Sequence, residues 1–163
     1  MNQALYPYLI LGAAVLHITE EFIFPGGFLD WGRKALSKFK RQKMADAVDS
    51  GMAIFVNALF ILFCIVNIVY YRQGSFMLYS LTGLILFNAF LHIGSSIVFR
   101  RYAPGLITSV LLYIPVSILI LLNTETINER IIFALIAGAL LHVIPLLIVF
   151  TKSRFINSKS KLA

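Results

Sequence analysis

The chain has 163 residues, of which 60% are hydrophobic and only 13% are charged, and its mean hydropathy is +0.88. Soluble domains carry about 25% charged residues, so this composition excludes an ordinary soluble protein and indicates a membrane protein. The net charge of +7 does not indicate a nucleic-acid partner, because basic residues beside a membrane contact anionic lipid headgroups.

Five segments are long and apolar enough to cross a bilayer, which takes about 20 predominantly apolar residues. They are residues 4–24, 50–71, 77–99, 105–123 and 131–150. Short connections join them, so we predict an all-α bundle of five transmembrane helices that forms one membrane domain over residues 1–151. Pro145 is expected to kink the last of these helices. Residues 152–163 are basic and rich in serine, which predicts a disordered tail.

The basic residues predict the orientation of these spans. Of the fourteen Lys and Arg residues, only Arg72 and Arg130 lie in the connections that follow the second and fourth spans. The positive-inside rule therefore places the N-terminus outside and the C-terminus in the cytoplasm. We expect a multi-pass protein of the bacterial cytoplasmic membrane.

The first span contains the most unusual residues of the chain, the run His17-Ile18-Thr19-Glu20-Glu21. On a helix, offsets of three and four residues place Glu20 and Glu21 on roughly the same face as His17. A charge at the centre of a bilayer costs about 2.5–3.5 kcal/mol. Two adjacent buried carboxylates cannot both stay ionised without a cation or protons nearby. The run therefore predicts a polar site inside the membrane domain.

Between the first two spans, residues 31–44 predict a short amphipathic helix. Trp31, Ala35 and Phe39 recur every four residues, whereas Lys and Arg fill the other faces. Such a pattern is typical of a helix that lies in the headgroup layer on the cytoplasmic side of the membrane. Asp49 precedes the second span, where it can cap the helix or contribute to a site.

Polar residues of the later spans lie at a similar depth to His17. Counted from the cytoplasmic end of its span, each of the five predicted helices carries a polar side chain at position seven or eight. These residues are His17, Asn57, His92, Tyr113 and His142. A lone intramembrane histidine often does no more than hydrogen-bond a neighbouring helix. Three histidines at one depth, beside two carboxylates, instead predict that they share a site.

A second short motif, Tyr102-Ala103-Pro104-Gly105, lies between the third and fourth spans. Together with the run at residues 17–21, it resembles the HXXEE family of small membrane proteins. That family is named for the first motif and also shows a Tyr-x-Pro-Gly motif and a further histidine. The resemblance covers most of the chain and marks as positions of interest His17, Glu20, Glu21, Tyr102, Pro104 and Gly105. The family carries no established reaction, so the resemblance implies a site and not its chemistry.

The residue types at this depth predict a mononuclear metal site. His17, His92 and His142 would bind through imidazole nitrogen, with Glu20 or Glu21 as the fourth ligand. This donor set suits zinc and also iron, copper or nickel, and we expect zinc or iron. The other glutamate would act as a general base on water at the metal. Side chains expected to orient the ligands or the substrate are Asn57, Asn88, Tyr102, Tyr113 and Asp49.

Three functions remain open from the sequence. The favoured one is a membrane-embedded, metal-dependent enzyme, either a hydrolase, an oxidoreductase or an isomerase, acting on a lipid or other hydrophobic substrate. The second is a metal-free isomerase in which His17 and the two glutamates move protons, as in the five-span sterol isomerases, whose motifs are absent here. The third is a non-enzymatic protein that binds haem, metal or lipid. Five spans are few for a transporter unless the chain forms a homo-oligomer.

Overall fold

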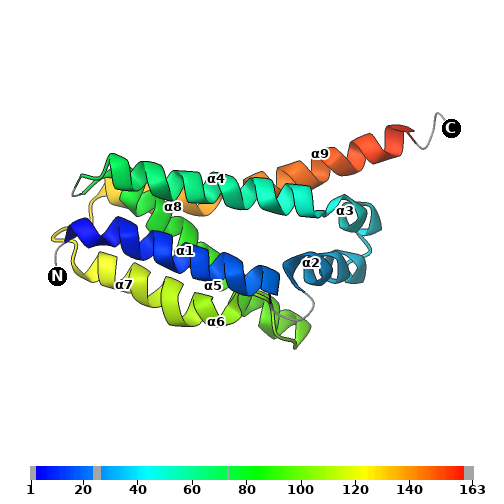
Figure 1. The fold of residues 1–163 in the computed structure, drawn as a ribbon, viewed down its shortest axis with the longest axis horizontal. Helices are drawn as coiled ribbons and strands as arrows, with labels where there is room; N and C mark the ends of the chain where they lie inside the picture. The colour runs from blue at the N-terminus through cyan, green and yellow to red at the C-terminus, as the bar shows by residue number, and fades with distance from the viewer. Residues whose placement is uncertain (1–2, 24–26, 73, 160–163) are drawn as a thin grey trace.

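The computed structural model describes residues 3–23, 27–72 and 74–159, and every regular element in these ranges is helical. The predicted all-α class is therefore confirmed. Figure 1 shows the arrangement of the elements, which in chain order are η1 (a 3-10 turn, Gln3–Leu5), α1 (Tyr6–Ile23), α2 (Gly27–Lys38), α3 (Gln42–Ala47), α4 (Ser50–Val69), α5 (Phe76–Phe99), α6 (Leu106–Thr108), η2 (a π-helical turn, Ser109–Tyr113), α7 (Ile114–Leu122), α8 (Glu129–Leu140) and α9 (Val143–Lys159).

Several helices are long and apolar enough to cross a membrane. Within the described ranges these are α4, α5 and the combined α8–α9 segment, with mean hydropathies of 2.6, 1.7 and 2.7. Gln3–Ile23 and α2 count as a fourth only when they are taken as one span bent by 68°, and Leu106–Leu122 is apolar but shorter. The chain is thus a multi-pass membrane protein with three or four candidate spans. The five-span count and the N-terminus-outside orientation stay predictions.

The last predicted span is interrupted a few residues before Pro145. Proline lacks an N–H group, and its ring clashes with the carbonyl four residues earlier, here that of Leu141. Accordingly α8 ends at Leu140 and α9 begins at Val143, which leaves His142 in the break. The helix is thus interrupted where a kink was expected.

The predicted disordered tail needs correction, because α9 continues as a helix to Lys159. α9 packs against α3 and α4, and Lys152 forms an ion pair with Asp49 at the start of α4. These contacts hold the basic segment against the other helices. Of the predicted tail, residues 160–163 lie outside the described residues.

The predicted amphipathic helix over residues 31–44 is also corrected, since two helices, α2 and α3, occupy this region (Figure 1). The break between them includes Lys40, whose φ of +57° lies in the left-handed region and cannot continue a right-handed helix. The aromatic face packs on the protein, because the rings of Trp31 and Phe39 lie 5.4 and 5.6 Å from that of Phe99 at the end of α5.

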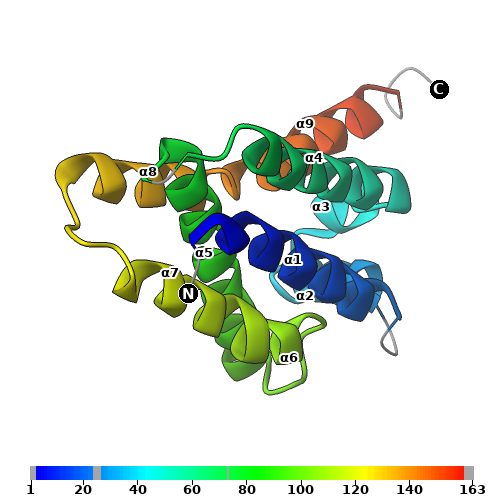
Figure 2. The same ribbon diagram turned by 60° about the vertical axis from the view of Figure 1, so that its left-hand side comes forward.

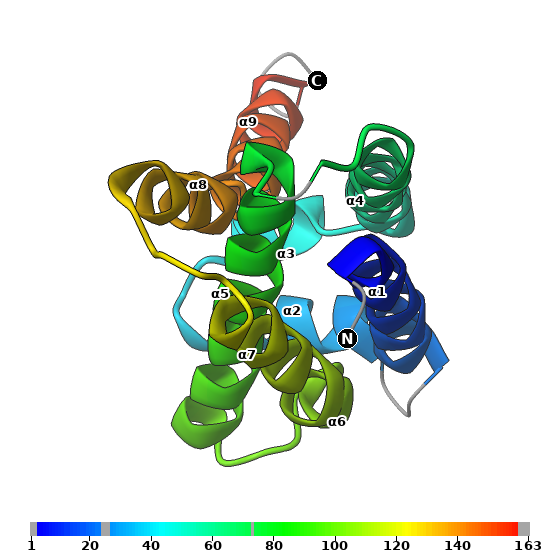
Figure 3. The same cartoon turned by 90° about the vertical axis from the view of Figure 1, so that its left-hand side faces the viewer.

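Helix α5 lies at the centre of the bundle, with α8 on one side and α1, η2 and α7 on the other (Figure 3). Its backbone nearly touches that of α8 at Gly83 and Gly138. A Cβ added at Gly83 would overlap the backbone of Leu135, and one added at Gly138 would overlap the carbonyl of Ser80. Only glycine allows this approach, which lets the two helices pack closely.

Helices α1 and α4 lie side by side in both Figure 1 and Figure 3, and Figure 2 shows α2 and α3 at one end of the pair. The buried face of α1 repeats every three or four residues, as expected for a helix with one packed side. Its members are Tyr6, Pro7, Ile10, Ala13, Ala14, His17, Glu20 and Glu21. The charged run therefore continues the face that packs the core.

Candidate metal centre

The core of the candidate site is a triad of side chains formed by His17, Glu21 and His92. All three side chains are buried, and their ligand atoms lie within 4.8 Å of one another. Oε1 of Glu21 is 3.5 Å from Nε2 of His17 and 3.3 Å from Nε2 of His92. The two imidazole rings meet edge to face, with centroids 4.9 Å apart. α1 supplies two members of the triad one helical turn apart, and α5 supplies the third.

The two carboxylate–imidazole separations, 3.5 and 3.3 Å, match those of neighbouring metal ligands better than those of hydrogen bonds. Zinc binds imidazole nitrogen and carboxylate oxygen at about 2.0–2.2 Å, which places neighbouring tetrahedral ligands about 3.3–3.5 Å apart. A charge-assisted hydrogen bond would instead measure about 2.7–2.9 Å. Nε2 of His17 has no hydrogen-bond partner among the described residues. The buried triad could therefore hold a metal ion.

Glu20 lies outside the triad, and its carboxylate accepts hydrogen bonds from the segment that follows α5. Oε1 accepts from the hydroxyl of Tyr102 and from the N–H groups of Gly105 and Ile107 at 3.2 and 3.0 Å. Oε2 accepts from the N–H group and the hydroxyl of Thr108 at 2.7 and 2.5 Å. The carboxylate thus satisfies N–H groups at the start of α6 that have no partner within the helix.

Tyr102 is a suitable donor to this carboxylate. Burial and the neighbouring Glu20 raise the pKa of the Tyr102 hydroxyl, so it stays protonated at neutral pH. This contact explains why the two motifs occur together, because Glu20 of the first motif binds the first residue of the second.

Gly105 lies directly against the imidazole rings of His17 and His92. Its φ is +92°, a conformation that favours glycine. A Cβ added there would lie 2.6 Å from Cε1 of His17 and 2.8 Å from Cε1 of His92. Any larger residue at this position would displace the two rings, so glycine is needed for the close approach.

Two further residues position the ring of His17. Its Nδ1 lies 2.9 Å from Oγ1 of Thr108, and its ring stacks on Tyr113 with centroids 4.4 Å apart and planes inclined by 29°. Tyr113 closes the π-helical turn η2, and its buried hydroxyl has no partner among the described residues. The wide turn precedes Pro115, whose ring would clash with a carbonyl of a regular helix. The sequence did not predict the contacts of Thr108 with His17 and Glu20.

His142 is not part of the triad, which differs from the expected set of three imidazoles. It lies in the break between α8 and α9, with its ring 5.2 Å from that of Phe87. Its Nδ1 is 3.2 Å from the carbonyl of Ala139. Equal depth along the spans therefore did not bring its ring into the triad, and the ring lies against Phe87 of α5 instead.

The remaining predicted residues occupy different places. Asn88 lies one turn before His92 on α5, and its buried Oδ1 has no partner within the described chain. Asn57 is a residue of α4 whose side chain lies in the space between α1 and α4, outside the triad. Asp49 caps α4 by accepting from the N–H group of Met52 at 2.9 Å. The Lys152 ion pair lowers the pKa of Asp49.

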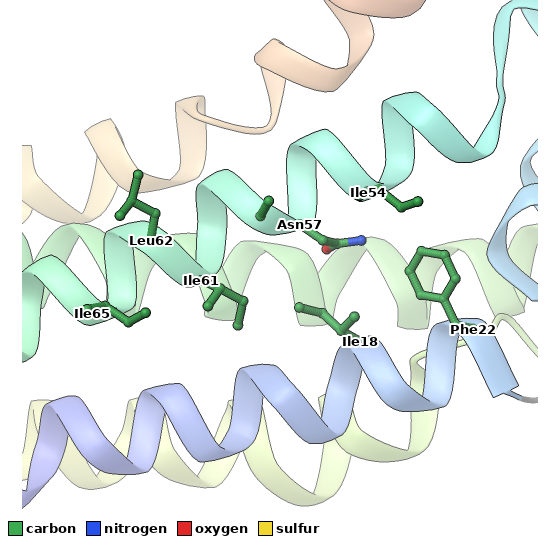
Figure 4. Close-up of a pocket in the computed structure, with 8 residues that line it drawn as sticks. Ile18, Phe22, Ile54, Asn57, Ile61, Leu62 and Ile65 are labelled. Carbon is green, nitrogen blue, oxygen red and sulfur yellow. The ribbon is translucent and has the colours of Figure 1, made fainter.

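An open, apolar groove runs between α1 and α4, with a volume of about 570 Å³. Figure 4 shows Ile18 and Phe22 of α1 pointing toward α4, where Asn57 is the polar residue among apolar neighbours. Ile18 and Phe22 directly follow His17 and Glu21 in the sequence. The groove and the triad therefore lie on adjacent faces of the same two turns of α1.

Comparisons with known proteins agree with the motifs. The chain is 32% identical over 145 residues to the protein called uncharacterized protein YrkK of Bacillus subtilis (strain 168), which covers 83% of this chain and 88% of that relative. No solved structure matches. A family described as protein of unknown function with HXXEE motif matches residues 8–120, which include both motifs and His92. The chain therefore belongs to the HXXEE family.

Proposed function

We propose that this protein is a membrane-embedded, metal-dependent enzyme that acts on a lipid or other hydrophobic substrate. Its metal would be one divalent transition ion, zinc or iron, bound by His17, Glu21 and His92. The observation that carries the proposal is the convergence of two imidazole nitrogens and one carboxylate oxygen within 4.8 Å in a buried site.

The number of ligands supports a catalytic site over a structural one. Structural zinc sites are closed by four protein ligands, whereas catalytic sites use three and keep a position for water or substrate. Two histidines and one carboxylate are also the ligands of many iron(II) enzymes that bind substrate at open positions. A metal bound here would polarise a substrate oxygen or activate water.

The charges around the site support a divalent ion. Glu20 and Glu21 are both buried, and with neutral imidazoles the group carries two negative charges. Such charges are costly inside a membrane unless they are compensated. A divalent cation at the triad would make the whole group neutral, while the donors around Glu20 stabilise its carboxylate locally.

The groove between α1 and α4 supports a hydrophobic substrate. Its volume of about 570 Å³ falls within the usual range of ligand sites, about 300–1,000 Å³. Its lining is apolar apart from Asn57, which could bind a single hydroxyl or carbonyl group of a lipid. The groove opens between two helices, so a molecule dissolved in the membrane can reach it from the side.

Elemental analysis of the detergent-purified protein tests the proposal. Wild type is expected to hold about one equivalent of zinc or iron per chain, and the His92→Ala and Glu21→Gln variants are expected to hold little. His142→Ala is the matched control, because it removes an intramembrane histidine outside the triad and should keep the metal.

Mass spectrometry of lipids bound to the same samples tests the substrate class. If wild-type protein from cells grown in metal-supplemented medium contains no metal, the proposed metal-dependent function is contradicted. Co-purified sterol or lipid in such a metal-free protein would then favour the isomerase in which His17 and Glu21 exchange protons.

A further inference from the structure

The hydroxyl of Thr108 lies between Glu20 and His17 and has one proton to donate. Its Oγ1 is 2.5 Å from Oε2 of Glu20, 3.3 Å from the carbonyl of Gly105 and 2.9 Å from Nδ1 of His17. A carboxylate and a carbonyl can only accept. The shortest of these contacts, to the carboxylate, is also the strongest kind, because the acceptor is charged. The proton of Thr108 therefore points to Glu20.

This assignment determines which nitrogen of His17 is protonated. Because the Thr108 proton is directed to Glu20, Oγ1 can only accept from Nδ1 of His17, which must then carry a hydrogen. In a neutral imidazole the other nitrogen is unprotonated. That nitrogen, Nε2, is the one that faces Glu21 and has no hydrogen-bond partner within the described residues.

We propose that Glu20 and Thr108 are positioning residues that hold His17 in the Nδ1-protonated tautomer, with the Nε2 lone pair directed into the triad. This inference deepens the proposed function and rests on it for its metal-binding part. Metal-bound histidines commonly donate their second N–H to a carboxylate, which fixes the ring and its tautomer. Here a threonine hydroxyl lies between the imidazole and the carboxylate.

The same contacts assign different tasks to the two glutamates of the motif. Glu20 acts on the metal site through Thr108 and His17 and would not touch the metal. The backbone N–H of Thr108 also donates to Oε2 of Glu20, at 2.7 Å, so the carboxylate holds both the main chain and the hydroxyl of one residue. This arrangement limits the rotation of the hydroxyl and so its choice of acceptor.

Nitrogen-15 NMR of histidine-labelled, metal-free protein in detergent or nanodiscs tests the tautomer directly. The protein has three histidines, and a His17→Gln spectrum identifies the signals of His17. Wild type and Thr108→Ser are expected to show a protonated Nδ1 and an unprotonated Nε2. Thr108→Val, which keeps the shape and removes the hydroxyl, is expected to show loss of this preference.

Metal affinity, measured by competition with a chelator, is the second readout. Thr108→Val should bind zinc about 10–100-fold more weakly than wild type, as is typical when the partner of a metal-bound histidine is removed. Thr108→Ser should restore the affinity. A structural role alone would lower stability without changing the tautomer of His17.

The wild-type spectrum can overturn the inference without any variant, since an Nε2-protonated His17 would contradict it. Unchanged tautomer and affinity in a folded Thr108→Val protein would contradict it as well, and Thr108→Ala replaces that variant if it does not fold. Wild type that binds no metal but shows the expected tautomer would refute the proposed function. It would still support the inference that Glu20 and Thr108 set the tautomer of His17.

Discussion

Glu20 and Glu21 are neighbours in α1, yet their carboxylates contact different partners. Oε2 of Glu20 accepts from the N–H group of Thr108 at 2.7 Å, whereas Oε1 of Glu21 lies 3.3 Å from Nε2 of His92. Successive residues of a helix point about 100° apart, so each carboxylate reaches its own partners. Glu20 therefore binds the turn between α5 and α6, whereas Glu21 belongs to the triad.

This division predicts different effects of neutralising the two acids. Glu20→Gln should lower the free energy of unfolding of the metal-free protein by about 1.5–3 kcal/mol, because it weakens hydrogen bonds to a charged group. Glu21→Gln should change that stability less and reduce metal affinity more, since it alters a ligand. Thermal unfolding in detergent with chelator, together with metal titration, measures both effects.

Added metal provides the internal control for this comparison. A ligand present at 100 times its dissociation constant stabilises a protein by about 2.7 kcal/mol. Zinc at that level should stabilise wild type by this amount and Glu21→Gln hardly at all. Equal stabilisation of the two proteins would show that Glu21 is not a ligand.

Gly105→Ala is expected to damage the triad without removing any of its ligands. The left-handed backbone costs a non-glycine residue about 1–3 kcal/mol. The added methyl group would also overlap Cε1 of His17 and of His92, at 2.6 and 2.8 Å. We expect loss of metal binding and a clear decrease in the unfolding temperature, measured by elemental analysis and a thermal scan.

Gly12→Ala is the matched control, because a Cβ at this position of α1 meets nothing within 4 Å. Alanine is also the better helix former by about 1 kcal/mol, so this variant should be as stable as wild type or more stable. Normal metal binding in Gly105→Ala would show that the turn does not constrain the imidazoles.

The close approach of α5 and α8 at Gly83 and Gly138 predicts a purely structural effect of substitution. Alanine at Gly138 would overlap the carbonyl of Ser80 and force α8 away from α5. Overpacking of this kind costs about 1–3 kcal/mol, and contact with a rigid backbone places it at the upper end. Unfolding in mixed detergent should show this loss, and Gly94→Ala on α5, where a Cβ has open space, should not. Similar stability of both variants would contradict the close α5–α8 packing.

The triad could be predicted from the sequence only in part. His17 and Glu21 stand out because charged or titratable groups are rare in an apolar helix, and their spacing of four residues places them together. Depth along a span also brought His92 into the prediction. Depth does not define the direction in which a side chain points, so His142 was expected in the site although its ring lies against Phe87.

The role of Thr108 had no recognisable signal in the sequence. A single threonine in an apolar segment usually bonds to its own helix, as Thr19 does with the carbonyl of Val15. Its contact with Glu20 joins residues 88 positions apart and depends on the path of the turn between α5 and α6. The break at Lys40 was missed for a related reason, because no glycine or proline marks it.

The ion pair between Asp49 and Lys152 predicts a pH dependence at the end of the bundle where α3 and α9 meet α4. Lys152 lowers the pKa of Asp49 below its ordinary value of 3.8. The pair therefore contributes stability above about pH 4, and this contribution is lost as the pH falls through the lowered pKa. Both side chains are partly exposed, at 39% and 41%, so the effect should be small.

Thermal scans of wild type and Lys152→Gln between pH 7 and about pH 2 test this prediction. The variant should unfold at a slightly lower temperature at pH 7, and the two proteins should converge in acid as Asp49 becomes protonated. Lys34→Gln, which removes the same charge from an exposed position on α2, is the control and should follow wild type throughout. A difference that persists unchanged at low pH would mean that Lys152 stabilises α9 through packing of its side chain and not through Asp49.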